Sequence, residues 1–98
     1  MTRPVTVVLP AALRDEAAGA SSVEVVVPAG GAARVRDVLD ALATANPLLE
    51  RRLRDERGQV RRHVNVFVAG DDTRSLLGQD TVVPDGAEVV VLPNIAGG

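Results

Sequence analysis

The residues with the clearest capacity for chemistry are the last two, Gly97 and Gly98, a diglycine at the carboxyl end of the chain. A strand-like run, Ala87–Leu92, leads towards them through Pro93. Glycine has no Cβ, so a diglycine adopts backbone angles closed to other residues and fits a narrow channel. Extended at about 3.3 Å per residue, the chain from Pro93 to Gly98 reaches roughly 15 to 20 Å. We therefore expect Gly98 to present its carboxylate to a partner's active site, with Gly97 giving flexibility and access.

Side chains offer little other covalent chemistry. The chain has no cysteine, which excludes disulfides, thiolate nucleophiles and thiolate metal ligands. The single histidine, His63, cannot form an imidazole cluster for zinc, and we assign it no role. Asp71 and Asp72 fit a turn better than a cation site, because two adjacent carboxylates without further oxygen ligands make a poor cage. The sequence predicts no metal and no bound cofactor.

All eleven basic residues are arginines, so the chain has no lysine amine to accept an isopeptide bond. In any conjugation reaction it would be the donor, through Gly98. The first residues contain too few apolar side chains for a signal sequence, and no run approaches the length of a membrane span. We expect a cytoplasmic protein with no membrane partner.

The 98 residues support one domain, predicted over 1–93, followed by a flexible tail over 94–98. Its core must be aliphatic, because Phe67 is the only aromatic residue. Alternating apolar residues predict strands over 5–9, 23–27, 64–68 and 87–93, with a brief edge strand over 81–83 and turns at 70–72 and 84–86.

One apolar stripe at helical spacing predicts the main helix: Val35, Val38, Leu39 and Leu42. This helix should stop at Asn46-Pro47, because the residue before proline is pushed out of the α region. Residues 48–56 predict at most a short polar helical turn, and 10–20 a loop. The order of elements indicates an α+β, β-grasp (ubiquitin-like) fold, in which a mixed sheet of four to five strands packs on one main helix.

Several short motifs resemble one family when taken in order: Leu9-Pro10, Leu13-Arg14, Val64–Val68, Asp72–Arg74, Asp85-Gly86, Val89, Val91, Leu92-Pro93 and Ala96–Gly98. The chain is similar to the ubiquitin-like sulfur carriers of the MoaD/ThiS type, and among them to the CysO-like carriers of cysteine biosynthesis. It departs from them at Asn94-Ile95 and in the Arg-rich stretch 51–62, which bears on the choice of partner and not on the class.

The resemblance implies that the chain is a protein cosubstrate and not an enzyme. An E1-like adenylating enzyme would consume ATP to activate the Gly98 carboxylate, and a persulfide or sulfide source would displace AMP to leave a thiocarboxylate. The sulfur would then pass to an accepting enzyme, such as a pyridoxal-phosphate-dependent cysteine synthase. Alternative acceptors are the large subunit of molybdopterin synthase and the enzymes that make thiamine or another sulfur-containing metabolite.

A second candidate feature is the sheet face turned away from the helix. If Val5, Val7, Val25, Val66, Val68, Val89 and Val91 point at the helix, then Val8, Val26, Phe67, Val90 and Leu92 point to the other side. An exposed antiparallel face should be mainly polar, so this apolar set predicts a docking patch near the base of the tail, unless a loop covers it. We predict the following partner-binding residues: Phe67, Val90, Leu92, Pro93, Ile95 and Ala96.

Charge is distributed unevenly. Residues 51–62 hold six arginines and two acids, net plus four, whereas residues 64–98 hold Arg74 and five acids, net minus four. The overall charge of −2 and the lack of interleaved aromatic residues speak against nucleic-acid binding, so the arginines are interpreted as a solvated loop. We expect the acidic segment beside the tail to steer it towards a basic cleft on the activating enzyme.

Two other functional classes remain open. In the first, the activated Gly98 acylates a lysine of a target, and the chain is a protein modifier. In the second, the chain is a non-covalent β-grasp interaction module and its diglycine is incidental.

Overall fold

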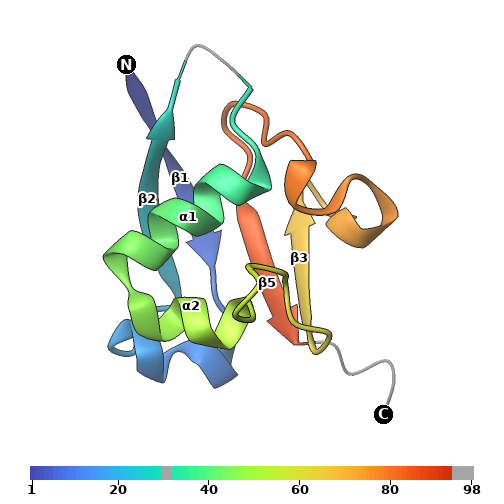
Figure 1. Cartoon of the computed structure of the whole chain (residues 1–98). Coiled ribbons are helices and arrows are strands. Elements are labelled where there is room, and N and C mark those ends of the chain that lie inside the picture. Colours follow the sequence, from blue (N-terminus) through green and yellow to red (C-terminus); the bar gives the residue numbers. More distant parts are fainter. Residues whose placement is uncertain (30–31, 94–98) are drawn as a thin grey trace.

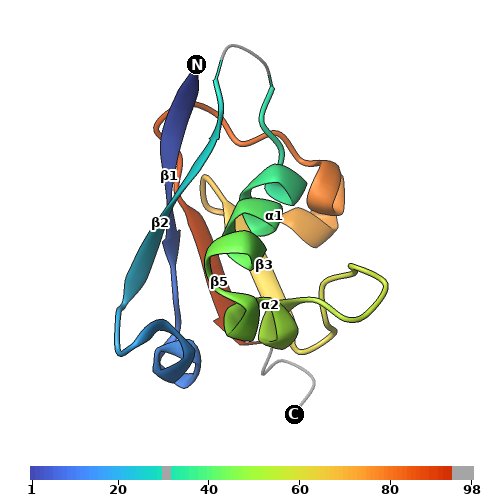
Figure 2. The same ribbon diagram turned by 60° about the vertical axis from the view of Figure 1, so that its left-hand side comes forward.

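The computed structural model describes residues 1–29 and 32–93, which form a five-stranded mixed sheet with two helices on one face (Figures 1 and 2). The strands lie in the order β2-β1-β5-β3-β4. Their bounds are Thr2–Val8 for β1, Ser22–Pro28 for β2, Val64–Val68 for β3, Asp71–Asp72 for β4 and Val89–Pro93 for β5. β1 pairs in parallel with β5, and the other neighbours are antiparallel. The predicted α+β architecture is confirmed.

The main helix, α1, spans Val35–Ala45 and packs its apolar stripe on the sheet. Its four predicted stripe residues are at most 1% exposed. The valines predicted to face the helix from the sheet are at most 4% exposed: Val5, Val7, Val25, Val66, Val68, Val89 and Val91. Alternation along the strands therefore predicted the core correctly, because a strand buries every second residue.

A second helix, α2, spans Pro47–Leu53 and corrects the prediction of a short polar turn. The side chain of Asn46 accepts a hydrogen bond from the backbone N–H of Leu49 at 3.2 Å and so caps this helix, while Pro47 occupies its first turn. Leu49 and Leu53, four residues apart on one helix face, are 0% and 1% exposed. Two leucines are enough to dock a helix this short, although charge dominates its sequence.

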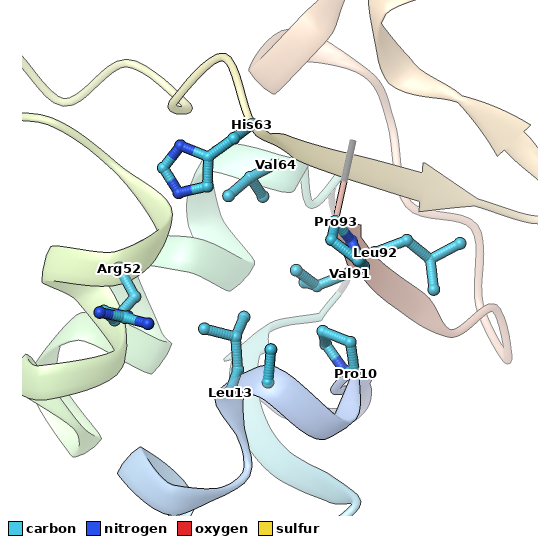
Figure 3. Close-up of a pocket in the computed structure, with 9 residues that line it drawn as sticks. Pro10, Leu13, Arg52, His63, Val64, Val91, Leu92 and Pro93 are labelled. Carbon is cyan, nitrogen blue, oxygen red and sulfur yellow. The ribbon is translucent and has the colours of Figure 1, made fainter. Parts of the chain in front are cut away.

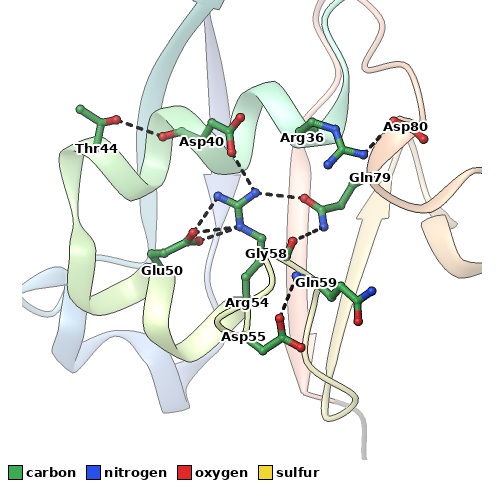
Figure 4. Close-up of polar contacts among 10 residues, drawn as sticks. All are labelled: Arg36, Asp40, Thr44, Glu50, Arg54, Asp55, Gly58, Gln59, Gln79 and Asp80. Carbon is green, nitrogen blue, oxygen red and sulfur yellow. Dashed lines mark hydrogen bonds and ion pairs between the residues drawn. The ribbon is translucent and has the colours of Figure 1, made fainter.

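Arg54 is buried against three elements and does not belong to a solvated loop (Figure 4). Its guanidinium donates to Glu50 of α2 at 2.7 and 2.8 Å, to Asp40 of α1 at 2.9 Å and to the Gln79 side chain at 3.1 Å. Gln79 in turn donates to the Gly58 carbonyl at 2.7 Å. Burial disfavours the charged guanidinium, but the two carboxylates outweigh this effect and raise the pKa of Arg54 above its ordinary value.

The edge of the sheet also differs from expectation. Residues 81–83 form no strand: Val82 makes only an isolated bridge with Arg34. The edge strand is instead β4, within the predicted turn, where Asp71 pairs with Val68. A reversal at Ala69 and Gly70, both with positive φ, brings β4 back onto β3. A two-residue strand depends on this hairpin pairing and not on apolar content, so alternation could not reveal it.

The segment between β1 and β2, predicted as a loop, contains 3₁₀ turns at Ala11–Leu13 and Asp15–Ala17. Leu13 is buried, at 8% exposed, and joins the core beneath α2. Among the helices of residues 1–29 and 32–93, none has the length and apolar character of a bilayer-spanning segment.

Candidate functional site

The chain leaves the sheet at Pro93, the last described residue, directly beside the start of β3. The β3–β5 register pairs Val64 with Pro93 at this end and Val68 with Val89 at the other. The predicted residues Ile95, Ala96, Gly97 and Gly98, together with the flexibility expected for 94–98, lie outside the described residues. The site that the structure describes is therefore the root of the tail.

An apolar hollow of about 80 Å³ opens beside Pro93 (Figure 3). We call it the tail-root pocket. Its apolar walls come from β5, the start of β3 and the 3₁₀ turn after β1, and include Pro10, Leu13, Val64, Val91, Leu92 and Pro93. Its polar rim is formed by Arg52 of α2 and by His63. Leu92 and Pro93, both predicted to contact a partner, are exposed and line this pocket.

A second hollow, of about 350 Å³, adjoins the tail-root pocket. It is lined by Arg51, Arg52, Arg61 and His63, and we call it the cationic groove. It shares Arg52 and His63 with the pocket, and no carboxylate is among the described residues that line it. Arg51 and Arg52, predicted in a solvated loop, lie on α2, and His63, for which no role is predicted, lines the groove. The sequence shows Arg51, Arg52 and Arg61, but only the fold brings them together with His63.

Two sets of hydrogen bonds order the connection from α2 to β3, which carries Arg61 and His63 of the groove. Arg74 donates from Nη2 to three carbonyls just before and at the start of β3, those of Arg61 and Arg62 at 3.0 Å and of Val64 at 2.7 Å. In the loop after α2, the backbone N–H groups of Gln59 and Arg57 donate to the Asp55 carboxylate at 3.0 and 2.9 Å. These bonds lower the pKa of Asp55, the bond from Gln59 most strongly.

The expectation of an acidic surface beside the tail is wrong. Asp71 and Asp72 follow the far end of β3, and Asp85 and Glu88 precede the far end of β5, so strand length separates them from Pro93. Asp85 is paired with Arg3 at 3.1 Å, and Asp80 with Arg36 at 2.9 Å. Asp71, Asp72, Asp85 and Glu88 are near the tail in sequence, but antiparallel pairing of β3 with β5 puts them at the opposite end of the sheet. Asp80 lies in a 3₁₀ turn against the start of α1. The polar side chains that border the tail root are instead Arg52 and His63.

The outer face of the sheet carries the predicted apolar side chains. Val8 is beside Val90, and Val90 is beside Phe67, so the three form one cross-strand row. They are half-buried, whereas Leu92 is 42% exposed and Val26, at the β2 edge, is 56% exposed. The predicted orientation is confirmed. Partner binding by Phe67, Val90, Leu92 and Pro93 stays a prediction.

Within the described part of the chain, no group of three or more histidine or carboxylate side chains is placed to hold a metal ion. The Asp71-Asp72 pair forms β4.

Residues 7–98 match the ThiS family. The chain belongs to this family. It is 39% identical over 83 residues to small archaeal modifier protein 1 of Haloferax volcanii, covering 85% of this chain and 88% of that protein. It is 34% identical over 95 residues to the sulfur carrier protein CysO of Mycobacterium tuberculosis, covering 96% and 98%. The resemblance to MoaD/ThiS-type and CysO-like carriers is confirmed.

Solved structures agree with this ThiS-family assignment. The crystal structure of the Amycolatopsis orientalis BexX/CysO complex contains a chain that superimposes with a TM-score of 0.78 at 34% identity, over 96% of this chain and 99% of that one. Small archaeal modifier protein 1 of Haloferax volcanii gives a TM-score of 0.76 at 31% identity, over 98% and 100%. The β-grasp fold is confirmed. So is the prediction that the chain is a small carrier-type protein and not an enzyme.

Proposed function

We propose that this chain is a sulfur carrier whose Gly98 carboxylate is activated and converted to a thiocarboxylate. The observation that carries the proposal is the match to the ThiS family, which extends over residues 7–98 and so includes the diglycine. The identity to CysO over 95 residues supports it. The described fold is consistent with this role, because it puts the root of the tail at one end of the sheet and leaves the chemistry to the terminus.

The proposed reaction needs two enzyme-catalysed steps. A carboxylate is a poor acyl donor because oxide is a very poor leaving group. In the first step, a carboxylate oxygen of Gly98 attacks the α-phosphorus of ATP and pyrophosphate leaves. In the second, a hydrosulfide attacks the acyl carbon and AMP leaves, so a carbon–sulfur bond replaces the carbon–oxygen bond to AMP. ATP is bound by an E1-like partner, and the carrier itself binds no cofactor.

The diglycine suits this role for steric reasons. Gly97 and Gly98 present no Cβ, so the terminal backbone can pass through a channel beside the nucleotide phosphates. A fully extended tail of five residues would reach beyond Pro93 by about 3.3 Å per residue. The folded body can therefore dock outside the active site that receives Gly98.

The similarity to known carriers also suggests which enzyme receives the sulfur. Similarity to CysO favours delivery to a pyridoxal-phosphate-dependent cysteine synthase, with molybdopterin synthase, thiamine synthesis or another sulfur-containing metabolite as alternatives. The solved complex of a CysO with BexX shows one carrier of this shape held by a partner protein.

A protein modifier is the second candidate, and the identity to small archaeal modifier protein 1 favours it. In that reaction the activated Gly98 would acylate a lysine of a target. The chain has no lysine of its own, so it could not form chains on itself through a side-chain amine.

An affinity-tagged chain expressed in its own organism separates the two candidates. A carrier should be recovered as the free protein, with a fraction bearing sulfur at Gly98. A modifier should be recovered in part as lysine-linked conjugates of higher mass. A variant lacking Gly98 is the control, and it should show neither product. Conjugates without any terminal sulfur would contradict the carrier proposal.

A further inference from the structure

The tail-root pocket and the cationic groove form one continuous surface with two chemical characters. Arg52 and His63 line both hollows. On one side of them the walls are apolar, with Leu13 and Val91 among them. On the other side, Arg51 and Arg61 complete the groove. A ligand that fills both hollows must carry an apolar group beside negative charge.

The groove arginines keep their charges available to such a ligand. Arg61 donates from Nε to the Arg51 carbonyl at 2.8 Å, which directs its side chain across the groove. Arg52 pairs with Glu16 at 3.2 Å, but its side chain remains 57% exposed. Arg51 is exposed at the end of α2. Glu16 beside Arg52 and Asp55 beside Arg61 offset part of the charge of the three guanidinium groups, and an anionic partner would offset more of it.

The position of the acids in the second half of the chain agrees with this. The acids of β4 and of the segment before β5 are at the end of the sheet opposite Pro93, and the groove is at the tail end. An acidic surface on a partner would therefore attract the groove end of the chain more strongly than the end that carries these acids.

We propose that the partner enzyme that takes up the tail puts an acidic segment into the cationic groove and an apolar side chain into the tail-root pocket. The identity of this partner rests on the proposed carrier function. The chemistry of the two hollows does not, and it can be tested without any enzyme.

A protein segment fits this surface better than a nucleic acid. Single strands bind through aromatic platforms on which bases stack. The chain has one aromatic residue, Phe67, and it is on the outer face of the sheet beside Val90. The apolar pocket of about 80 Å³ suits the end of an aliphatic side chain.

The first test is an NMR titration of the full ¹⁵N-labelled chain with a capped peptide, Glu-Glu-Leu-Glu-Glu. Saturable shift changes are expected at Leu13, Arg52 and His63, and they should weaken by about threefold or more between low salt and roughly 0.3 M salt. The peptides Lys-Lys-Leu-Lys-Lys and Glu-Glu-Ser-Glu-Glu are the controls for charge and for the apolar anchor. Both should bind more weakly.

Charge reversal locates the binding. Arg51→Glu should weaken peptide binding by about tenfold. Among residues 1–29 and 32–93 the Arg51 side chain makes no hydrogen bond or ion pair that the change would remove, and only its backbone carbonyl accepts a bond, from Arg61. Arg57→Glu, on the neighbouring loop outside the groove, is the matched control and should bind within about twofold of the wild type. The inference is overturned if the lysine peptide binds equally well, if Arg51→Glu has no effect, or if a single-stranded oligonucleotide binds the same residues more tightly than the acidic peptide.

Kinetics with the organism's adenylating enzyme separate this inference from the proposed function. Arg51→Glu should raise KM for the carrier by about tenfold with little change in kcat. If the wild type acquires sulfur but Arg51→Glu has the same KM and the acidic peptide does not bind, the groove inference fails and the carrier function stands. If the wild type acquires no sulfur while the acidic peptide binds as expected, the carrier function fails and the groove stands.

Discussion

At the scale of single residues, Arg54 shows how position decides what a charge does. It is 6% exposed and held by Glu50 and Asp40, whereas Arg57, three residues later, is exposed. In the sequence the two arginines look alike, because both stand in a run of charged residues. Burial of Arg54 follows from its place at the end of α2, facing α1 and Gln79.

Replacing Arg54 by methionine should lower the free energy of unfolding by about 2 kcal/mol, because the hydrogen bonds to Glu50, Asp40 and Gln79 are lost together. The loss is no larger because these partners are partly exposed and can bond to water instead. Urea denaturation followed by circular dichroism measures the change. The control is Arg57→Met, expected within about 0.5 kcal/mol of the wild type. Equal losses in the two variants would mean that the Arg54 network does not stabilise the fold.

At the scale of elements, α2 differs most from its prediction, because a helix with two buried leucines stands where a short polar turn was expected. Leu49 is 0% exposed and its neighbour Leu48 is 61% exposed, so adjacent leucines have opposite environments. Leu49→Ala should cost about 2 to 5 kcal/mol of unfolding free energy, and Leu48→Ala less than about 0.5 kcal/mol. Thermal and urea denaturation compare the two. Similar small effects would show that α2 contributes little to the core.

The outer face of the sheet allows a test of the predicted docking patch. Phe67→Asp puts a charge in the row formed with Val90 and Val8, and should raise KM for activation by about tenfold if this row contacts the partner. Val26→Asp is the comparison variant, because Val26 belongs to the predicted apolar set but lies at the β2 edge, outside the row. If the row alone contacts the partner, Val26→Asp leaves KM unchanged. The melting temperature of each variant is measured alongside, so that lost binding is separated from lost folding. An unchanged KM in a folded Phe67→Asp variant would exclude the row from docking.

These elements also show what the sequence could predict. Alternating valines reveal which face of a strand is buried, because the side-chain period of a strand is local. The same rule predicted that Val8, Phe67 and Val90 lie on the outer face, whereas their alignment in one row depends on the strand register. It could not reveal β4, whose pairing comes from the hairpin at Ala69-Gly70, nor the docking of α2, which depends on Leu49 and Leu53 meeting an existing core.

At the scale of the whole molecule, the tail root, the apolar pocket and the cationic groove share one end of the sheet. Asp71, Asp72, Asp85 and Glu88 are close to the tail in sequence. In the fold they lie at the opposite end of the sheet from Pro93, because β3 and β5 pair antiparallel. Charge counts along a chain predict a surface only after the register is known. A carrier presents the same tail to each of its partners. The position of the tail root, the tail-root pocket and the cationic groove at one end of the sheet suits that role.

The most direct measurement is the intact mass of the full chain after incubation with ATP, sulfide and the adenylating enzyme of the same organism. A variant lacking Gly98, and a reaction without ATP, are run beside it. We predict that the full chain alone, and only with ATP, gains the mass difference of one oxygen replaced by one sulfur. An unchanged mass, with an enzyme shown to form the acyl adenylate at Gly98, would contradict the carrier function.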